Sequence, residues 1–404
     1  MKKENLAALL MAGAMCLGLL AGCSSNQPSS SPSSPAASAS SDPDTSDGPS
    51  TGNTVIKIGG IGPLTGSAAQ YGMATKQGAE IAVAEINALG GIQFELNSQD
   101  DQADGELGVN AYNNLLDWGM QILYGCTTSG SCAAVAAETY SDRVFQLTPS
   151  ASSTVVTDGH DNVFQMCFTD PNQGKTAAQF IYDNKLATKV AVIYNNSDDY
   201  STGIYQGFAA AAADLGLELV SVTTFPDDTT TDFSVQLTDA YKNGAELVLL
   251  PIYYTPASNI LIQANQLGYD FTYFGCDGLD GILTLEGFNT ALAEGVYVLT
   301  PFDTTSDSAK SFIEKYETAY GEAPNQFAAD GYDCIYALAA ACEQANITGD
   351  MSCDEACEAL ISVFTSSDFS VDGLTGSGMQ WSANGEVSKA PLIVRIEDGA
   401  YVNQ

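Results

Sequence analysis

Basic residues are scarce in this chain of 404 residues: 13 Lys and Arg stand against 49 Asp and Glu, for a formal net charge of −36. Proteins that bind nucleic acid cluster Lys and Arg side chains to displace the counterions of the phosphate backbone. A surface this negative repels phosphates instead. Nucleic acid is therefore excluded as a partner.

Paired metal ligands are missing as well. The chain has one histidine, His160, and its ten cysteines form no C-x-x-C pair. Structural zinc sites usually show two ligands at such a short spacing. No metal site is predicted.

The single histidine also limits catalysis. Ser129 and Ser131 are candidate nucleophiles, but His160, the only candidate base, lies in the polar turn "TDGHDN", and no G-x-S-x-G motif is present. Gly174-Lys175-Thr176 resembles the end of a phosphate-binding loop, yet Thr169 stands where that motif has its first glycine. We therefore predict neither an enzyme nor a cofactor.

Long apolar runs are limited to the N-terminus. Lys2 and Lys3 precede an apolar run over residues 6–20 that is too short to span a bilayer, which is typical of a signal peptide over residues 1–22. The following "LAGC" resembles a bacterial lipobox, and the resemblance implies cleavage before Cys23 and acylation of its thiol. The acyl chains would anchor the protein at the extracytoplasmic face of the cell membrane.

Residues 23–53 follow this lipidation site. From Ser24 onward they are mostly Ser, Pro, Ala, Asp and Gly, without an aromatic or branched aliphatic side chain. Such a segment buries too little apolar surface to offset its ordering entropy, so we expect a disordered linker. A folded region is predicted from about Thr54. Its eight cysteines stand largely in apolar runs such as "FQMCF", which favours buried thiols.

Short apolar runs alternate with helical patterns from Thr54 onward. Because strands separated by helices form parallel sheets covered on both faces, the sequence predicts an α/β fold. The first set has strands at 55–62, 92–99, 120–125 and 144–150, and helices at 67–89, 105–118 and 131–142. The second has helices at 173–186, 200–215, 233–243 and 256–267, and strands at 189–195, 217–225, 246–252 and 271–275.

Two such sets predict two lobes. A strand at 295–301, helices at 308–320 and 326–344, and a β-rich tail over 378–402 follow, and Asn384-Gly385 indicates a hairpin turn. Ligands of open α/β sheets bind at the carboxyl ends of the strands. The loops after the strands are therefore the candidate site.

One of these loops, "YGCTTSGSCAAVA" (residues 124–136), is rich in hydroxyl side chains at a strand-to-helix junction. Thr128, Ser129 and Ser131 stand where the first N–H groups of the helix lack partners, so they suit a carboxylate, although simple helix capping explains them equally well. Ser150 and Ser152 follow the next strand. The candidate partner for an ammonium is Asp277, and the candidate aromatic walls are Tyr71, Tyr200, Tyr253 and Tyr254.

An ordered series of segments resembles the leucine/isoleucine/valine-binding proteins, the substrate-binding components of branched-chain amino-acid ABC transporters. The series is "IKIGGIGPLTGSAAQYGMATKQGAEIAVAEINALGGI", "YGCTTSGS", "LTPSAS", "FTDPNQG", "PIYYTPASNILIQANQLG" and "GCDG". It covers nearly all of the chain from Val55. The resemblance implies the type 1 periplasmic binding fold, with two Rossmann-like lobes joined by three crossovers near Asp170, Thr300 and Gly376.

The resemblance also implies a division of the chain and a site. The first lobe would use residues 55–170 and 301–375, and the second 171–300 and 376–404. The ligand carboxylate would meet Ser129, Ser150 and Ser152, its ammonium Asp277, and its side chain Tyr71, Tyr200 and Tyr253. Asp277 replaces a longer Glu of the family, Ser150 replaces Ala, and Tyr254 is an added phenol. Ala103 replaces a disulfide partner.

The expected function is that of a lipid-anchored solute-binding protein. It would bind an L-amino acid, branched-chain or similarly apolar, as a monomer and deliver it to the permease and ATPase subunits of an ABC importer. The alternative is a sensory protein of the same fold that binds an amide or another small ligand.

Overall fold

The structure is a computed structural model that describes residues 55–404. The predicted signal peptide (1–22), the lipidation site Cys23 and the linker (23–53) lie outside the described residues. Among the residues that the structure describes, none of the helices has both the length and the apolar character needed to cross a membrane.

The first lobe is built on a five-stranded sheet in which all strands are parallel, in the order β2-β1-β3-β4-β5. Its strands are β1 (Ile56–Gly62), β2 (Phe94–Asp100), β3 (Ile122–Gly125), β4 (Phe145–Thr148) and β5 (Val163–Gln165). The helices are α1 (Ala69–Ala88), α2 (Gly105–Trp118), α3 (Ser129–Asp142), α9 (Gln326–Ala345) and α10 (Cys353–Phe364). One core holds side chains of α1, α9 and α10 on one face of the sheet, and another holds those of α2 and α3 on the other.

The second lobe has a seven-stranded sheet in the order β12-β11-β10-β9-β8-β6-β7. Its strands are β6 (Lys189–Asn195), β7 (Glu218–Phe225), β8 (Leu247–Leu250), β9 (Thr272–Gly275), β10 (Tyr297–Thr300), β11 (Leu392–Glu397) and β12 (Ala400–Asn403). Strand β11 pairs antiparallel with both β10 and β12, and all other neighbouring strands of this sheet pair parallel. The helices α4 (Asp170–Asp183) and α5 (Asp199–Leu215) cover one face, and α6 (Ser234–Lys242) and α7 (Tyr254–Leu267) the other.

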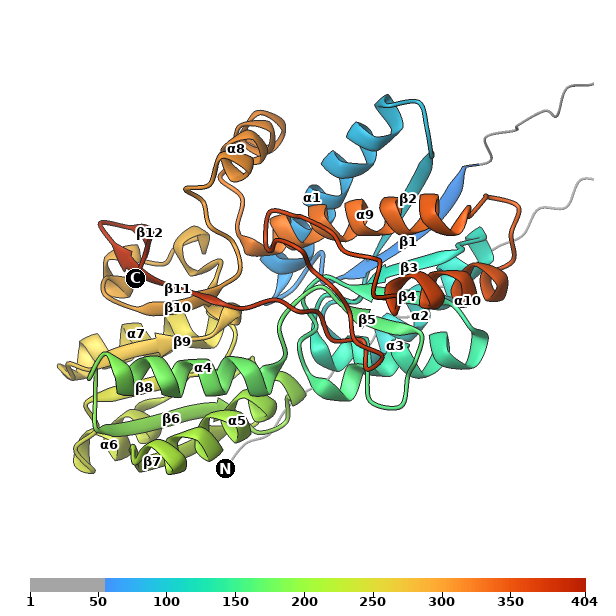
Figure 1. The fold of residues 1–404 in the computed structure, drawn as a ribbon. Coiled ribbons are helices and arrows are strands. Elements are labelled where there is room, and N and C mark those ends of the chain that lie inside the picture. Colours follow the sequence, from blue (N-terminus) through green and yellow to red (C-terminus); the bar gives the residue numbers. More distant parts are fainter. Residues whose placement is uncertain (1–54) are drawn as a thin grey trace, which may run out of the picture. The chain divides into compact units, whose positions relative to one another are not determined.

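Figure 1 shows the two sheets with their covering helices as separate lobes. The chain leaves the first lobe after β5. After β10 it passes through α8 (Asp307–Tyr320) and returns to the first lobe as α9 and α10, and it joins the second sheet again at β11. Residues 55–404 also contain four short 3₁₀ turns: η1 (Thr154–Val156), η2 (Asp277–Leu279), η3 (Ile282–Thr284) and η4 (Thr290–Ala293). The α/β class predicted from the sequence is confirmed, and the sheets of the two lobes are mainly parallel, with antiparallel pairing at β11 and β12.

The lobe boundaries inferred from the resemblance stay a prediction. Met379 and Trp381 lie in the core of α1, α9 and α10, and the N–H of Gln165 donates to the carbonyl of Gly385. Residues after Gly376 therefore still pack on the first sheet, and the chain enters the second sheet only at Leu392.

One α-helix and one strand of the described residues were absent from the sequence prediction. Helix α10 begins with a capping box, in which Ser352 and Glu355 bind each other's backbone N–H groups, and this S-x-x-E pattern is a readable start signal. Strand β5 has only three residues, too few for a periodic pattern. In addition, α4 begins at Asp170, three residues before the predicted Gln173.

Close contacts between helices explain why two helical positions are occupied by glycine. A Cβ at Gly78 in α1 would lie 1.9 Å from the carbonyl oxygen of Ala328 in α9, and one at Gly174 in α4 would lie 2.3 Å from that of Ile204 in α5. Gly174 is thus a packing residue inside a helix. It does not belong to a loop that could cradle a phosphate.

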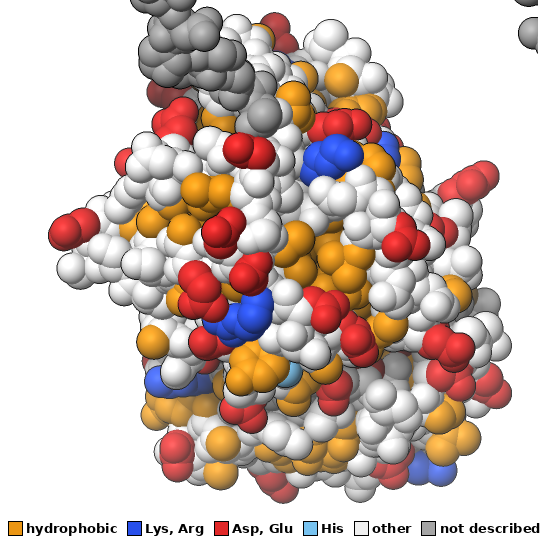
Figure 2. Space-filling model, turned by 90° about the vertical axis from the view of Figure 1, so that its right-hand side faces the viewer, with side chains coloured by type: hydrophobic (Ala, Val, Ile, Leu, Met, Phe, Trp, Pro, Cys, Tyr) orange, Lys and Arg blue, Asp and Glu red, His pale blue; other side chains and the backbone are white. Residues whose placement is uncertain are grey.

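The surface follows the composition. Figure 2 shows a face on which many Asp and Glu side chains are spread and few Lys or Arg occur. Inside, Lys389 forms an ion pair with Asp330 at 2.7 Å, with both side chains buried. All eight cysteines of the part that the structure describes are free thiols, and seven of them are buried. The buried thiols that the apolar runs of the sequence favoured are therefore confirmed.

Candidate ligand-binding site

The hydroxyl-rich segment lies at the carboxyl end of β3, where α3 begins. Thr128 is the N-cap residue of α3, and its Oγ1 is buried without a hydrogen-bond partner among the described residues. The first N–H groups of a helix have no partners within it, and they carry partial positive charge. Thr128 and these N–H groups together can hold an anion.

The loop after β4 completes this side of the site. Ser150 Oγ donates to the carbonyl of Thr127 at 2.6 Å, and Ser129 Oγ accepts from the N–H of Ser153 at 3.2 Å. These bonds fix the two loops against each other because β3 and β4 are neighbours in the sheet. The first lobe therefore presents a rigid set of hydroxyl groups.

Asp277 faces this set from the second lobe. It follows β9 and begins the turn η2, and it is 4% exposed. Its N–H donates to Gln173 Oε1 at 3.1 Å, and its carbonyl accepts from Gln326 Nε2 at 3.1 Å. Gln173 lies in α4 and Gln326 in α9, so the turn is held from both lobes.

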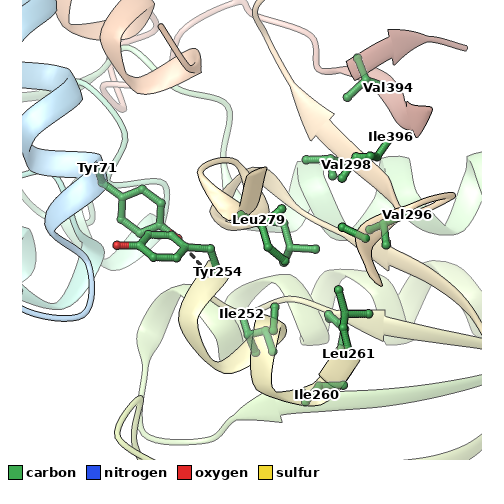
Figure 3. Close-up of a cluster of buried hydrophobic side chains, with 14 of the residues drawn as sticks. Tyr71, Ile252, Tyr254, Ile260, Leu261, Leu279, Val296, Val298, Val394 and Ile396 are labelled. Carbon is green, nitrogen blue, oxygen red and sulfur yellow. Dashed lines mark hydrogen bonds between the residues drawn. The ribbon is translucent and has the colours of Figure 1, made fainter. Parts of the chain in front are cut away.

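Aromatic side chains form the walls. Tyr71 of α1 lies 4.4 Å from Phe327 and 5.5 Å from Tyr253, measured between ring centroids, and Tyr253 stacks on Tyr200 at 5.1 Å. Figure 3 shows Tyr71 extending from α1 toward Tyr254 at the start of α7, with a hydrogen bond between them. In that bond the N–H of Tyr254 donates to Tyr71 Oη at 3.1 Å.

These groups surround one small cavity between the lobes. Its volume is about 10 Å³, and it is lined by Tyr71, Thr127, Thr128, Ser129, Ser150, Tyr200, Tyr253, Asp277, Gly278 and Phe327. Among the described residues that line it, none carries a positive charge. A space of this size holds about one water molecule. The lobes must separate before a larger molecule can enter.

The structure brings six of the seven predicted binding residues to this cavity. The exception is Ser152, whose Oγ lies 3.5 Å from Gln173 Nε2 behind the lining. The added phenol Tyr254 packs behind Tyr71, at 4.9 Å between ring centroids. Ser131 turns away and donates to Asp101 Oδ2 at 2.7 Å.

The hydrolase arrangement is not found in the described part of the chain. His160 contacts the carbonyl of Val156 at 3.1 Å and the ring of Tyr140 at 5.4 Å, and it does not line the cavity. The candidate base is thus placed apart from Ser129.

The sequence prediction missed three lining residues. Thr127 belongs to the hydroxyl-rich segment and Gly278 follows Asp277, so their positions after strands were readable signals. Phe327 lies in the first turn of α9, far along the sequence. Its approach to Tyr71 depends on the packing of α9 against α1, which no local pattern announces.

Burial controls the charges in the site. It raises the pKa of Asp277 to about 6, although hydrogen bonds from Tyr200 and Gln173 and from the Gly278 N–H lower it. Burial also raises the pKa of Tyr71, Tyr200 and Tyr253 well above 10, so the phenols stay neutral. Asp277 is therefore the ionisable acid of the lining at neutral pH.

Direct hydrogen bonds join the lobes beside the cavity. Tyr71 Oη donates to the carbonyl of Gly278, Gln70 Nε2 to that of Thr284 at 3.1 Å, and Thr255 Oγ1 to that of Ser67 at 2.9 Å. All three pairs connect residues at the start of α1 with the second lobe, namely with the turns η2 and η3 and with the first turn of α7. A larger groove of about 650 Å³ lies beyond Gln70 and Met73, and none of the predicted site residues lines it.

Two α/β lobes that direct strand ends into a shared cavity define a two-lobed solute-binding protein. The sequence model of a family described as periplasmic binding protein matches residues 55–400. A Leu/Ile/Val-binding protein homolog of Brucella melitensis is 31% identical over 304 residues, covering 73% of this chain and 80% of the relative. The chain therefore belongs to the leucine/isoleucine/valine-binding family of periplasmic binding proteins.

Other relatives agree. A leucine-, isoleucine-, valine-, threonine- and alanine-binding protein of Pseudomonas aeruginosa is 27% identical, covering 76% of this chain and 82% of its own. The solved structure of the branched-chain amino acid transporter substrate binding protein LivJ from Streptococcus pneumoniae in complex with isoleucine superposes with a TM-score of 0.77 at 30% identity, over 86% of this chain and 97% of that one. The leucine binding protein LivK of Thermotoga maritima also gives 0.77, at 28% identity over 87% and 98%.

Proposed function

We propose that this protein binds an L-amino acid with an apolar side chain, branched-chain or similar, between its lobes and delivers it to the permease of an ABC importer. It would do so at the extracytoplasmic face of the membrane, anchored through Cys23. One observation carries the proposal: an anion cradle on the first lobe and a buried carboxylate on the second face the same cavity. A zwitterion has the two charges that this arrangement needs.

The carboxylate of the ligand would bind at the start of α3. The N–H groups of the first turn and the hydroxyls of Thr128 and Ser129 would donate to it, while Ser150, whose hydroxyl donates to the Thr127 carbonyl, would hold the loop in place beside it. The unpartnered Oγ1 of Thr128 supports this assignment, because a buried hydroxyl without a partner is costly unless a ligand satisfies it.

The ammonium of the ligand would pair with Asp277. A buried carboxylate is unfavourable by itself, and a cation placed against it restores much of the lost solvation. The side chain of the ligand would contact the rings of Tyr71, Tyr200, Tyr253 and Phe327, and burial of apolar surface there adds affinity.

Closure of the lobes would complete the binding step. The interlobe bonds of Tyr71, Gln70 and Thr255 form only when the lobes are together. Closure excludes water from the cavity, which strengthens the charge interactions at both ends of the ligand. The closed form would then present both lobes to the permease.

The relatives support the choice of ligand and system. Their names specify leucine, isoleucine and valine, and one solved relative holds isoleucine. The lipobox supports the anchor, although Cys23 lies outside the described residues.

A thermal-shift screen of the mature protein against the common L-amino acids tests the proposal, followed by calorimetry on those that bind. We expect micromolar or tighter binding of L-leucine or a similar acid, which corresponds to about 8 kcal/mol of standard free energy or more. A free ligand concentration of 100 times the dissociation constant should raise the free energy of unfolding by about 2.7 kcal/mol.

The matched controls are leucine without its ammonium (4-methylpentanoate) and without its carboxylate (3-methylbutylamine). Each should bind far more weakly than L-leucine. Equal binding of 4-methylpentanoate, or no binding of any amino acid, would overturn the proposal. Preferential binding of neutral amides would instead support the sensory alternative.

A further inference from the structure

The hydroxyl of Tyr200 makes two hydrogen bonds to the turn that carries Asp277. Its Oη donates to Asp277 Oδ1 at 2.7 Å and accepts from the N–H of Gly278 at 2.9 Å. Tyr200 belongs to the first turn of α5 and is 3% exposed. One buried hydroxyl thus holds both the carboxylate and the backbone of this turn.

Packing keeps this hydroxyl in place. A Cβ at Gly278 would lie 2.6 Å from Tyr200 Oη, so Gly278 permits the close approach. On its other side the Tyr200 ring stacks on Tyr253, with an angle of 21° between the planes. The side chain has little room to adopt another rotamer, so the bond to Asp277 is preorganised.

We propose that Tyr200 is a positioning residue for Asp277: its hydroxyl orients the carboxylate and keeps it ionised for the ammonium of the ligand. The inference rests on the proposed function, in which Asp277 binds that ammonium. It goes beyond the aromatic-wall role of Tyr200 because it depends on one oxygen atom and not on the ring.

The surroundings of Asp277 make this donor important. The titratable groups that act on it are Tyr71 of α1, Cys167 after β5, Asp170 of α4, Tyr200 of α5, Asp330 of α9, and Cys276 and Asp280 of its own loop. None of these groups is a cation. The hydrogen bonds from Tyr200, Gln173 and the Gly278 N–H are what favours the ionised carboxylate against burial.

The variant Tyr200→Phe removes the oxygen and retains the ring. Calorimetry with L-leucine would compare the affinity of this variant with that of the wild type between about pH 5.5 and about pH 8.5. The ratio of wild-type to variant affinity should rise to about tenfold at the acid end, because a rise of one unit in the pKa of Asp277 lowers its ionised fraction about tenfold there. At the alkaline end, where Asp277 is ionised in the wild type and in the variant, the ratio should be smallest. A ratio that is the same at every pH would overturn the positioning role.

Tyr205→Phe on the same helix is the matched control, because Tyr205 stacks on Tyr194 and does not line the cavity. Its affinity should follow that of the wild type at every pH. If Tyr200→Phe does not fold, 3-fluorotyrosine at position 200 supplies a stronger donor, and the loss of affinity should move to lower pH. An unmoved profile would then contradict the inference.

The two proposals fail in distinguishable ways. If the wild type binds no amino acid, the proposed function is wrong. If the wild type binds L-leucine and Asp277→Asn abolishes binding, while Tyr200→Phe shows a constant ratio, only the positioning role is wrong.

Discussion

Asp277 illustrates how a single side chain can be unfavourable for folding and useful for binding. It is 4% exposed, and burial raises its pKa to about 6 from the usual value of 3.8. Because the folded state binds the proton more tightly than the unfolded state, this group makes the protein less stable as the pH rises from about 4 to about 6. Such strain is often retained at sites where a ligand relieves it.

We predict that Asp277→Asn makes the protein without added ligand more stable at neutral pH. The neutral amide lacks the desolvation penalty, so the free energy of unfolding should rise by about 2 kcal/mol at pH 7. The gain should vanish at about pH 2, which lies below both the folded and the unfolded pKa, because the wild-type carboxyl is then protonated in both states. Urea denaturation at several pH values measures this. The binding free energy of the amino-acid ligand should weaken by several kcal/mol in the same variant, as expected when one partner of a buried ion pair is removed.

Asp214→Asn serves as the control, since Asp214 is exposed on α5 and surface changes usually alter stability by less than about 0.5 kcal/mol. A variant at position 277 that is equally stable or less stable at every pH would show that burial of this carboxylate is not costly.

Helix pairs determine how the site is framed. α1 carries Tyr71 and α9 carries Phe327, and the two helices touch through backbone at Gly78 and Ala328. The contact sets the distance between the helices and therefore the approach of the two rings, which lie 4.4 Å apart. A glycine far from the cavity thereby contributes to its wall.

Gly78→Ala should therefore destabilise the protein although alanine is the better helix former. The added methyl would lie 1.9 Å from the Ala328 oxygen, and overpacking of this kind costs about 3 kcal/mol. Thermal unfolding followed by circular dichroism measures the loss.

Gly130→Ala in α3 is the matched control, because its Cβ would meet no atom within 4 Å. Its stability should stay equal or rise by up to about 1 kcal/mol. Equal stability of wild type and Gly78→Ala would mean that α1 and α9 can move apart without penalty.

The whole molecule carries an excess of negative charge that its few cations do not balance. With 13 basic residues against 49 acidic ones, repulsion opposes the compact state, and it also opposes the approach of the two lobes. The interlobe hydrogen bonds of Tyr71, Gln70 and Thr255 act against that repulsion. Stability and closure therefore share a dependence on ionic strength.

We expect salt to stabilise this protein. Raising sodium chloride from about 20 mM to about 500 mM shortens the Debye length from about 20 Å to about 4 Å and screens the repulsion. The Tm should rise by several degrees in a scanning-calorimetry series. Potassium chloride at equal ionic strength should give the same rise, whereas a constant or falling Tm would show that surface ion pairs outweigh the repulsion.

Local patterns were sufficient for most elements and for part of the site. The helical spacing of Ala74, Gly78, Ile81, Ala82 and Ile86 is typical of a helix face that packs on a core. In α1 four of these residues are buried and Ile81 is half-buried. The rule that ligands bind at strand ends placed Ser129 and Asp277 at the cavity that they line. Phe327 escaped prediction because its contact with Tyr71 joins segments that are distant in the chain.

The sequence by itself determined the α/β class, the charge and the strand ends that face the cavity, because each depends on composition or on short-range periodicity. The family followed from the resemblance of an ordered series of segments. Only the tertiary structure decided which hydroxyls line the cavity, that Ser152 lies behind it, and that Tyr200 binds Asp277. These outcomes depend on side-chain rotamers and on the approach of two lobes, which are set by packing between segments that no local pattern connects.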